Sequence, residues 1–108
     1  MIKIKLGKEE LRMHGHAMPA EGELTHSRAC AAATMLAFTL GDAIDEYLMK
    51  EYSDEERRVE AKVRSGHLRI RWQADDRTDE IARTIAVGYR RLAKEYPKHV
   101  SFRQEGSA

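Results

Sequence analysis

Five segments of the chain alternate between apolar and polar residues, which is the pattern of a half-buried β-strand. A short turn over residues 7–10 joins the first two segments, and Ser65 and Gly66 form a two-residue turn between the third and fourth. The pattern therefore predicts two antiparallel hairpins and one further strand, at residues 2–6, 11–16, 59–64, 68–72 and 100–103.

Two further segments carry apolar residues at helical spacing. Thr25 and Ser27 are both possible N-caps of the first helix, and a cap at Ser27 puts Cys30 in the first helical turn. Asp76 or Thr78 is the expected cap of the second helix, which ends before Pro97. The predicted apolar stripes are Ala33, Leu36, Ala37, Leu40, Ile44, Tyr47 and Leu48 in the first helix, and Ile81, Ile85, Gly88, Tyr89, Leu92, Ala93 and Tyr96 in the second.

These elements follow in the order ββαββαβ. Amphipathic strands and helices are most simply packed as an α+β domain of two layers, with both helices on one face of a mainly antiparallel five-stranded sheet. We expect residues 1–108 to form one domain, with Trp72 and Phe102 turned toward the core. The opposite face of the sheet is then basic, with Lys3, Lys5, Arg12, His14, Lys62, Arg64, Arg69, Arg71 and Arg103 beside a single carboxylate, Glu60.

Composition narrows the class of protein. The chain is 42% hydrophobic and 34% charged, values typical of a soluble globular domain. It has no apolar run near the ~20 residues of a membrane span, and Met1 leads directly into the first strand, so we expect a cytoplasmic protein. A net charge of +1 does not, on its own, indicate a nucleic-acid or membrane partner. The chain has a single cysteine, which excludes an internal disulfide.

The candidate chemistry lies between Gly15 and Thr34. Cys30 begins an alanine-rich helical run, and a helix start and a nearby imidazolium both stabilise a thiolate. His16 is the candidate base because Gly15 beside it permits a backbone conformation that other residues resist. The alternatives are a core cysteine and a polar histidine at a strand end, and His26 competes with His16 as the base.

A metal site is a weaker interpretation of the same segment. His14, His16, His26 and Cys30 are possible zinc ligands, since His14 and His16 would project from the same side of a strand. They lack the paired short spacings of structural zinc sites. We therefore expect neither a metal nor another cofactor.

The run Gly15, His16, Ala17, followed after a loop by Cys30 to Thr34, resembles the signature of the ribosomal-processing cysteine proteases called Prp. The resemblance extends over nearly the whole chain, including Glu95, Tyr96, Pro97, His99 and Val100 near the C-terminus. It implies a homodimeric endopeptidase that removes an N-terminal extension from a large-subunit ribosomal protein, or cleaves a phage structural protein with a similar cleavage sequence.

The resemblance also implies roles for individual residues. Cys30 matches the nucleophile and His16 the general base, while Gly15 and Ala17 frame the histidine. The chain departs from the family pattern at Ser27, where an acidic residue is usual. Glu21 and Glu23 are then candidates to orient the histidine, and Met18 stands where the family often has glycine.

A non-enzymatic RNA- or ribosome-binding module is the alternative function. It is suggested by the basic face of the sheet. It is weakened because Trp72 and Phe102, predicted to point inward, would leave that face few aromatic side chains for stacking on bases.

Overall fold

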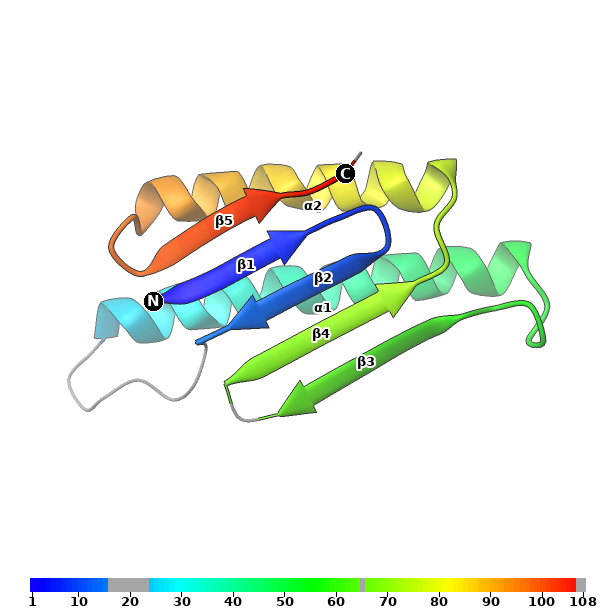
Figure 1. Ribbon diagram of the computed structural model, residues 1–108, viewed down its shortest axis with the longest axis horizontal. Helices are drawn as coiled ribbons and strands as arrows, with labels where there is room; N and C mark the ends of the chain where they lie inside the picture. The colour runs from blue at the N-terminus through cyan, green and yellow to red at the C-terminus, as the bar shows by residue number, and fades with distance from the viewer. Residues whose placement is uncertain (16–23, 65, 107–108) are drawn as a thin grey trace.

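The computed structural model describes residues 1–15, 24–64 and 66–106, and for residues 24–27 it describes the backbone alone. Within this part of the chain, two helices pack against one face of a five-stranded sheet (Figure 1). The elements are β1 (Ile2–Leu6), β2 (Glu10–His14), α1 (Leu24–Glu51), β3 (Val59–Arg64), β4 (His67–Trp72), α2 (Asp76–Glu95) and β5 (Val100–Gln104). The predicted two-layer α+β fold is confirmed.

The strand order across the sheet is β3-β4-β2-β1-β5. Neighbouring strands pair antiparallel except β1 and β5, which run parallel, so the sheet is mixed and mostly antiparallel. The inward residues of the four strands β1, β2, β4 and β5 form one side of the core, where Ile4, Leu11 and Met13 are almost fully buried. Alternation then turns the intervening polar residues to the helix-free face.

Both predicted helices are present, with their apolar stripes against the sheet. On α1, Ala33, Ala37, Leu40, Ile44 and Leu48 are fully buried. The helix begins at Leu24, so the prediction that Ser27 caps it is wrong by one turn. Apolar spacing locates the buried face of a helix, but it does not fix the residue at which the first turn forms.

The start of α2 is held by a capping box. Its N-cap is Asp75, and the prediction of Asp76 or Thr78 is corrected, because Asp75 accepts from the Thr78 backbone N–H at 2.8 Å. Thr78 Oγ1 in turn accepts from the backbone N–H of Asp75, also at 2.8 Å. The hydroxyls of Tyr47 and Tyr52, at the end of α1, donate to the second oxygen of Asp75 at 2.7 and 2.8 Å. One carboxylate thus ties the end of α1 to the start of α2.

Strand β3 differs from its prediction. Its apolar residues Val59, Ala61 and Val63 were expected to face the core, but Ala61 is exposed and Val63 is 61% exposed. The reason is its place at the edge of the sheet, where it pairs only with β4 and lies beyond most of the helix layer (Figure 1). Exposed Phe38 of α1 lies beside this strand, at a shallow groove of about 190 Å³ that Val59 and Ala61 also line.

Candidate active site

Gly15 ends β2 in a conformation that only glycine adopts readily. Its φ angle is +79°, in the left-handed region. A Cβ atom at this position would lie 2.3 Å from the carbonyl oxygen of Met1, which belongs to the backbone. The Gly15 N–H donates to the carbonyl oxygen of Gly66 at 2.9 Å. The expectation that Gly15 adopts a backbone conformation that other residues resist is therefore confirmed. The backbone atoms of Met1 and Gly66 surround this glycine.

The left-handed turn at Gly15 interrupts the alternation of β2. His14 belongs to the exposed face of the sheet, and an unbroken strand would direct His16 to that same face. β2 ends at His14 and His16 lies outside the described residues, so the expectation that His14 and His16 project from one side of a strand stays a prediction. His16, Ala17, Met18, Glu21 and Glu23 themselves lie outside the described residues.

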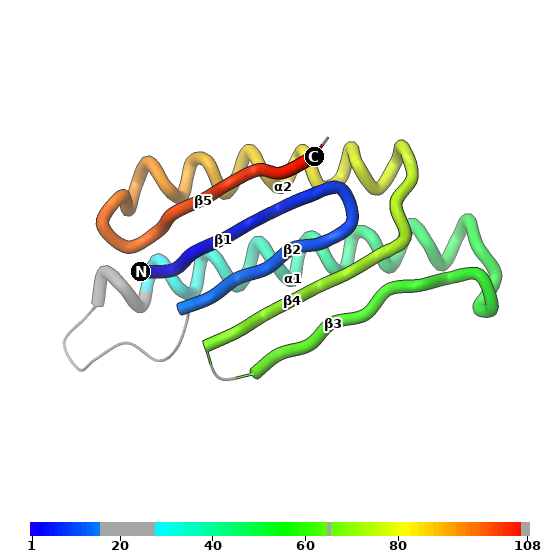
Figure 2. Tube along the Cα trace, in the orientation of Figure 1, coloured from blue at the N-terminus to red at the C-terminus, as the bar shows by residue number. Residues whose placement is uncertain are grey.

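Cys30 lies near the start of α1, and the cyan part of that helix lies at the end of the molecule where β2 also ends (Figure 2). Its side chain is partly buried and packs against the hydrophobic core. Ala29 and Ala33 on either side of it are fully buried, and the Tyr89 hydroxyl of α2 donates to the Ala33 carbonyl at 3.0 Å. The thiol is thus carried by a segment of α1 that is fixed against both the sheet and α2.

The position of Cys30 within α1 corrects one expectation. Cys30 is in the second turn, because the helix begins at Leu24, and not in the first turn as predicted. The electrostatic effect of a helix start falls off within its first turn. Cys30 therefore lies one turn farther from the helix start than the sequence suggested. The side chains of Ser27 and His26 are outside the described residues.

The described residues do not bring together His14 and Cys30, two of the four possible zinc ligands named from the sequence. His14 lies on the helix-free face of the sheet, whereas Cys30 packs on the opposite side with the helices. Two of that set's proposed ligands therefore lie on different sides of the sheet. In the described ranges, no three residues among His, Cys, Asp and Glu group closely enough to hold a metal ion.

The helix-free face carries the predicted basic residues and two that the sequence analysis missed. His67 lies directly opposite His14 in the β2–β4 register, with the ring centroids 4.4 Å apart. Extending the alternation of β4 by one residue would have identified it. Glu10 is the second, since it belongs to β2 and not to the preceding turn, and it pairs with Arg12 at 3.0 Å and with Arg69. Partial burial opposes ionisation of Glu10, but the two arginines outweigh it and lower its pKa.

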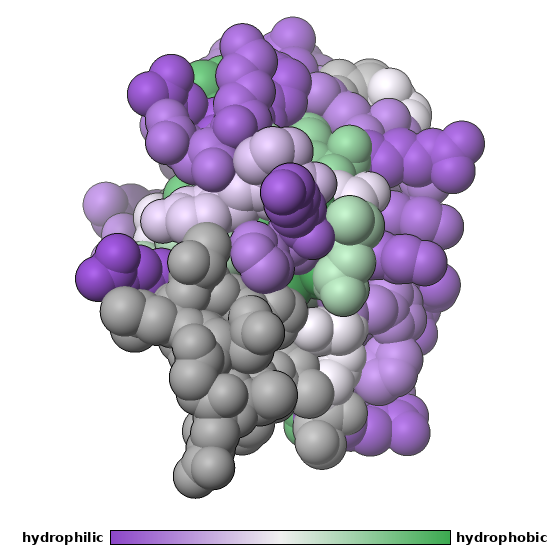
Figure 3. Space-filling view, turned by 90° about the vertical axis from the view of Figure 1, so that its left-hand side faces the viewer, coloured by the Kyte–Doolittle hydropathy of each residue, from purple (hydrophilic) through white to green (hydrophobic). Residues whose placement is uncertain are grey.

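Figure 3 looks onto the end of the molecule at which β2 ends, where hydrophilic residues surround a smaller set of pale and hydrophobic residues near the centre. Hydrophilic residues are continuous along the right-hand side of this view, where the helix-free face is seen edge-on. Neither described helix is long and apolar enough to cross a membrane.

Comparison with known proteins places these features in a family. The model of the family described as cysteine protease Prp matches residues 1–101, which is nearly the whole chain. The matched range includes both Gly15 to Ala17 and Cys30 to Thr34. No curated protein matches the sequence.

Several solved structures share the fold. SMU.848 from Streptococcus mutans has a TM-score of 0.75 at 19% identity, with 98% of each chain covered. The essential ribosomal processing protease Prp from S. aureus, in complex with a substrate peptide, has a TM-score of 0.71 at 22% identity. The same S. aureus protease with a covalently linked product peptide has a TM-score of 0.72 at 23% identity. In both, 97% of this chain and all of that chain are covered.

Proposed function

Because this chain belongs to the Prp family of cysteine proteases, we propose that it is an endopeptidase in which Cys30 is the nucleophile and His16 the general base. Gly15 and Ala17 frame the histidine, and residues 1–108 act as one protease domain. The observation that carries the proposal is Gly15, whose left-handed turn stops the strand immediately before His16.

The proposed reaction proceeds through a thioester. His16 takes the proton from the Cys30 thiol, and the sulfur attacks the carbonyl carbon of the scissile peptide bond. The C–N bond then breaks, the leaving amine receives the proton from His16, and the N-terminal part of the substrate stays bound to Cys30 as an acyl group. Water, deprotonated by His16, hydrolyses this thioester and restores the thiol. The covalently linked product peptide of the S. aureus relative supports such a covalent path.

The substrate that we propose is a protein with an N-terminal extension. The relative from S. aureus is a ribosomal processing protease, which supports a large-subunit ribosomal protein as the substrate of this chain. A phage structural protein with a similar cleavage sequence is the other substrate of this class. A ribosomal substrate also implies that the enzyme acts in the cytoplasm.

We further propose that two copies of the chain form a homodimer through β3 and the neighbouring part of α1. The exposed apolar residues Met35, Phe38 and Val63 lie on these elements. An edge strand offers unpaired backbone groups, and two copies of it can pair about a two-fold axis. In sedimentation velocity, Phe38→Glu should shift the protein toward monomer, and Val87→Glu, at an exposed apolar site on α2, should not.

A cleavage assay tests the proposed activity. The substrate is a peptide with the hydrophobic-aromatic processing sequence expected for the family, followed by mass spectrometry to locate the cut. Cys30→Ala should abolish cleavage, and His16→Ala should lower kcat/KM by at least about 100-fold, the usual contribution of a general base. His99→Gln, a histidine change in the connection after α2, is the matched control and should retain activity. A Cys30→Ala variant that still cleaves would refute the assignment.

A further inference from the structure

The helix-free side of the sheet carries a continuous set of cationic and imidazole side chains, which we call the basic face. All belong to strands and all are exposed or partly exposed. The outward strand residues that the structure describes include only two carboxylates, Glu10 and Glu60. The basic face consists of Lys3, Lys5, Arg12, His14, Lys62, Arg64, His67, Arg69, Arg71 and Arg103.

Strand register arranges this face in rows that cross the sheet. The row nearest Gly15 runs Arg64, His67, His14, Lys3, and the next runs Lys62, Arg69, Arg12, Lys5, Arg103. Each row spans at least four strands, or about 14 Å at the usual strand spacing. The third row alternates in sign, with Glu60, Arg71 and Glu10. Positive charge is therefore concentrated in the half of the face near Gly15.

This arrangement is unfavourable for the isolated protein. Like charges directly opposite each other on neighbouring strands destabilise a sheet. Glu10 offsets part of the repulsion in the second row through Arg12 and Arg69. The row nearest Gly15 has no carboxylate among its described members. A bound polyanion would relieve the repulsion in both rows.

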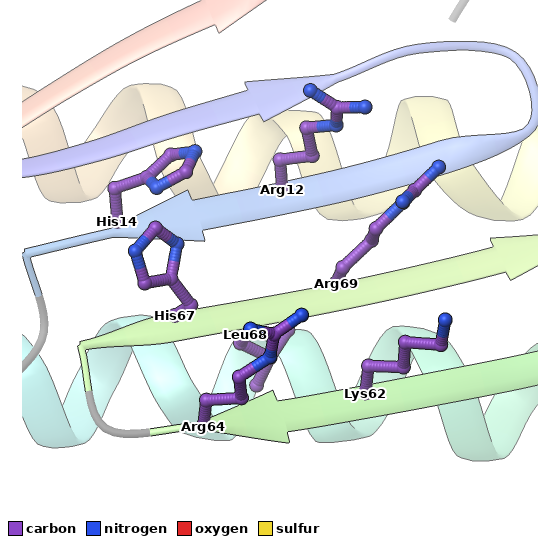
Figure 4. A pocket seen from close by; sticks show the side chains of 7 residues that line it. All are labelled: Arg12, His14, Lys62, Arg64, His67, Leu68 and Arg69. Carbon is purple, nitrogen blue, oxygen red and sulfur yellow. The ribbon is translucent and has the colours of Figure 1, made fainter.

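A shallow pocket of about 270 Å³ lies between the two rows (Figure 4). His14 and His67 stand at one end of it, and Arg12 and Arg69 lie farther along the same two strands. Arg64 and Lys62 line it from β3, over the side chain of Leu68. The wall of the pocket therefore offers hydrogen-bond donors from three strands to an anionic group.

We propose that the basic face binds the sugar–phosphate backbone of RNA. The face is formed by side chains that point away from the plane of the sheet, and its strands β1, β2 and β4 are each paired on both sides, so it offers a ligand mainly charge and side-chain donors. An acidic peptide would need carboxylates in one particular order, whereas every nucleotide carries a phosphate. Trp72 is buried, and the ring of Phe102 stacks on that of Tyr89 with the ring centroids 5.5 Å apart, so neither Trp72 nor Phe102 is available to stack on a base. We therefore expect binding to be independent of the RNA sequence. This binding adds to the proposed proteolysis and does not depend on it.

Fluorescence anisotropy with a labelled 20-nucleotide oligouridine tests this proposal, using the full chain with Cys30→Ala so that no proteolysis intervenes. Affinity should fall steeply with salt, with a log–log slope of about −3.5 if roughly five phosphates are neutralised. Arg64→Glu should weaken binding about tenfold and flatten that slope. Arg91→Glu makes the same charge change at an exposed site on α2, and should weaken binding less than twofold.

Two results would overturn the proposal. One is an equal loss of affinity in Arg64→Glu and Arg91→Glu, which would attribute binding to net charge and not to the basic face. The other is tighter binding of a polyglutamate peptide of equal charge than of oligouridine, which would identify an acidic protein as the partner. Thermal unfolding of both variants verifies that each is folded.

The two histidines give an independent readout. Partial burial, together with the neighbouring cations, lowers the pKa of His14. Bound phosphates would oppose that effect and favour the protonated ring, so affinity should increase several-fold between pH 7.5 and pH 5.5. A His14→Gln and His67→Gln double variant should lose this increase, and pH-independent binding by the parent protein would contradict the proposal. The groups that face His14 are His67, Arg12, Lys5, Lys3 and, across His67, Arg64.

Discussion

The two ends of the molecule are built differently. At the Asp75 end, where α1 finishes and α2 begins, one carboxylate accepts hydrogen bonds from Thr78, Tyr47 and Tyr52. At the Cys30 end, β2 stops at His14, just before the left-handed Gly15, and α1 begins without an Asp or Glu in its first turn. The Asp75 end thus joins the helices to each other, whereas the Cys30 end carries the proposed nucleophile.

The difference shows how a chain of 108 residues can hold a reactive group without losing its fold. Capping bonds and tertiary hydrogen bonds at the Asp75 end stabilise both helices. The Cys30 end is held instead by packing of Ala29 and Ala33 and by the hydrogen bond from Tyr89. Changes at the Asp75 end should therefore alter stability without altering the proposed activity.

The largest effect on stability is expected at the Cys30 end, from Gly15→Ala. A left-handed conformation costs a non-glycine residue about 1–2 kcal/mol, and the contact with the Met1 carbonyl adds to it, for a total of about 2–4 kcal/mol. Gly106→Ala is the matched control, because its φ angle is +63° but its Cβ would have no neighbour nearer than 3.9 Å. Urea unfolding should show a clearly smaller loss for Gly106→Ala. Equal losses would mean that the contact with Met1 contributes nothing.

A smaller effect is expected at the Asp75 end. Asp75→Ala removes the N-cap of α2 and the acceptor of two tyrosine hydroxyls, and should lower the free energy of unfolding by about 2 kcal/mol. Its kcat/KM should stay within about threefold of the parent at a temperature where both are folded, because the site is at the other end. Asp76→Ala removes a neighbouring acidic residue of the first turn and should cost less than about 1 kcal/mol. A collapse of activity in folded Asp75→Ala would break the proposed separation.

The smallest expected effect is a pH dependence of the stability that the Asp75 carboxylate contributes to the fold. Burial of Asp75 opposes ionisation, but the Thr78 N–H and the two tyrosine hydroxyls outweigh it and lower the pKa of its carboxyl group. The folded protein then binds this proton less tightly than the unfolded chain, so the carboxylate stabilises the fold above about pH 4. That stability is lost as pH falls through the lowered pKa. The difference in urea midpoint between the parent and Asp75→Asn should shrink from pH 6 to pH 3, and a constant difference would contradict the assignment.

Much of the fold follows from periodicity in the sequence. Strict alternation located all five strands, and most of the predicted apolar stripe of α1 is buried, with Leu36 and Tyr47 partly buried. Alternation did not show that β3 is an edge strand, because Val59, Ala61 and Val63 have the same pattern whether or not a helix covers them. Which strands the helices cover is decided by strand order, and strand order depends on pairing between distant segments.

The candidate site was predictable in part. The φ angle of Gly15 was anticipated from its residue type and its place before His16. The turn of α1 that carries Cys30 was not, because both Thr25 and Ser27 are good caps and the helix begins before either. His67 was missed because the strand was taken to start one residue later, at Leu68.

The most direct test of the central claim is the pH dependence of Cys30 alkylation by iodoacetamide in the parent protein, His16→Ala and the control His99→Gln. Cys30 is the chain's one thiol, so the rate reports on a single group. With Cys30 in the second turn of α1, the helix start contributes little, and a reactive thiolate below pH 7 requires the imidazole. We predict rapid labelling below pH 7 in the parent and in His99→Gln, and its loss in His16→Ala. Slow labelling in all three proteins, as for an ordinary thiol, would contradict the dyad and leave Cys30 as a core residue.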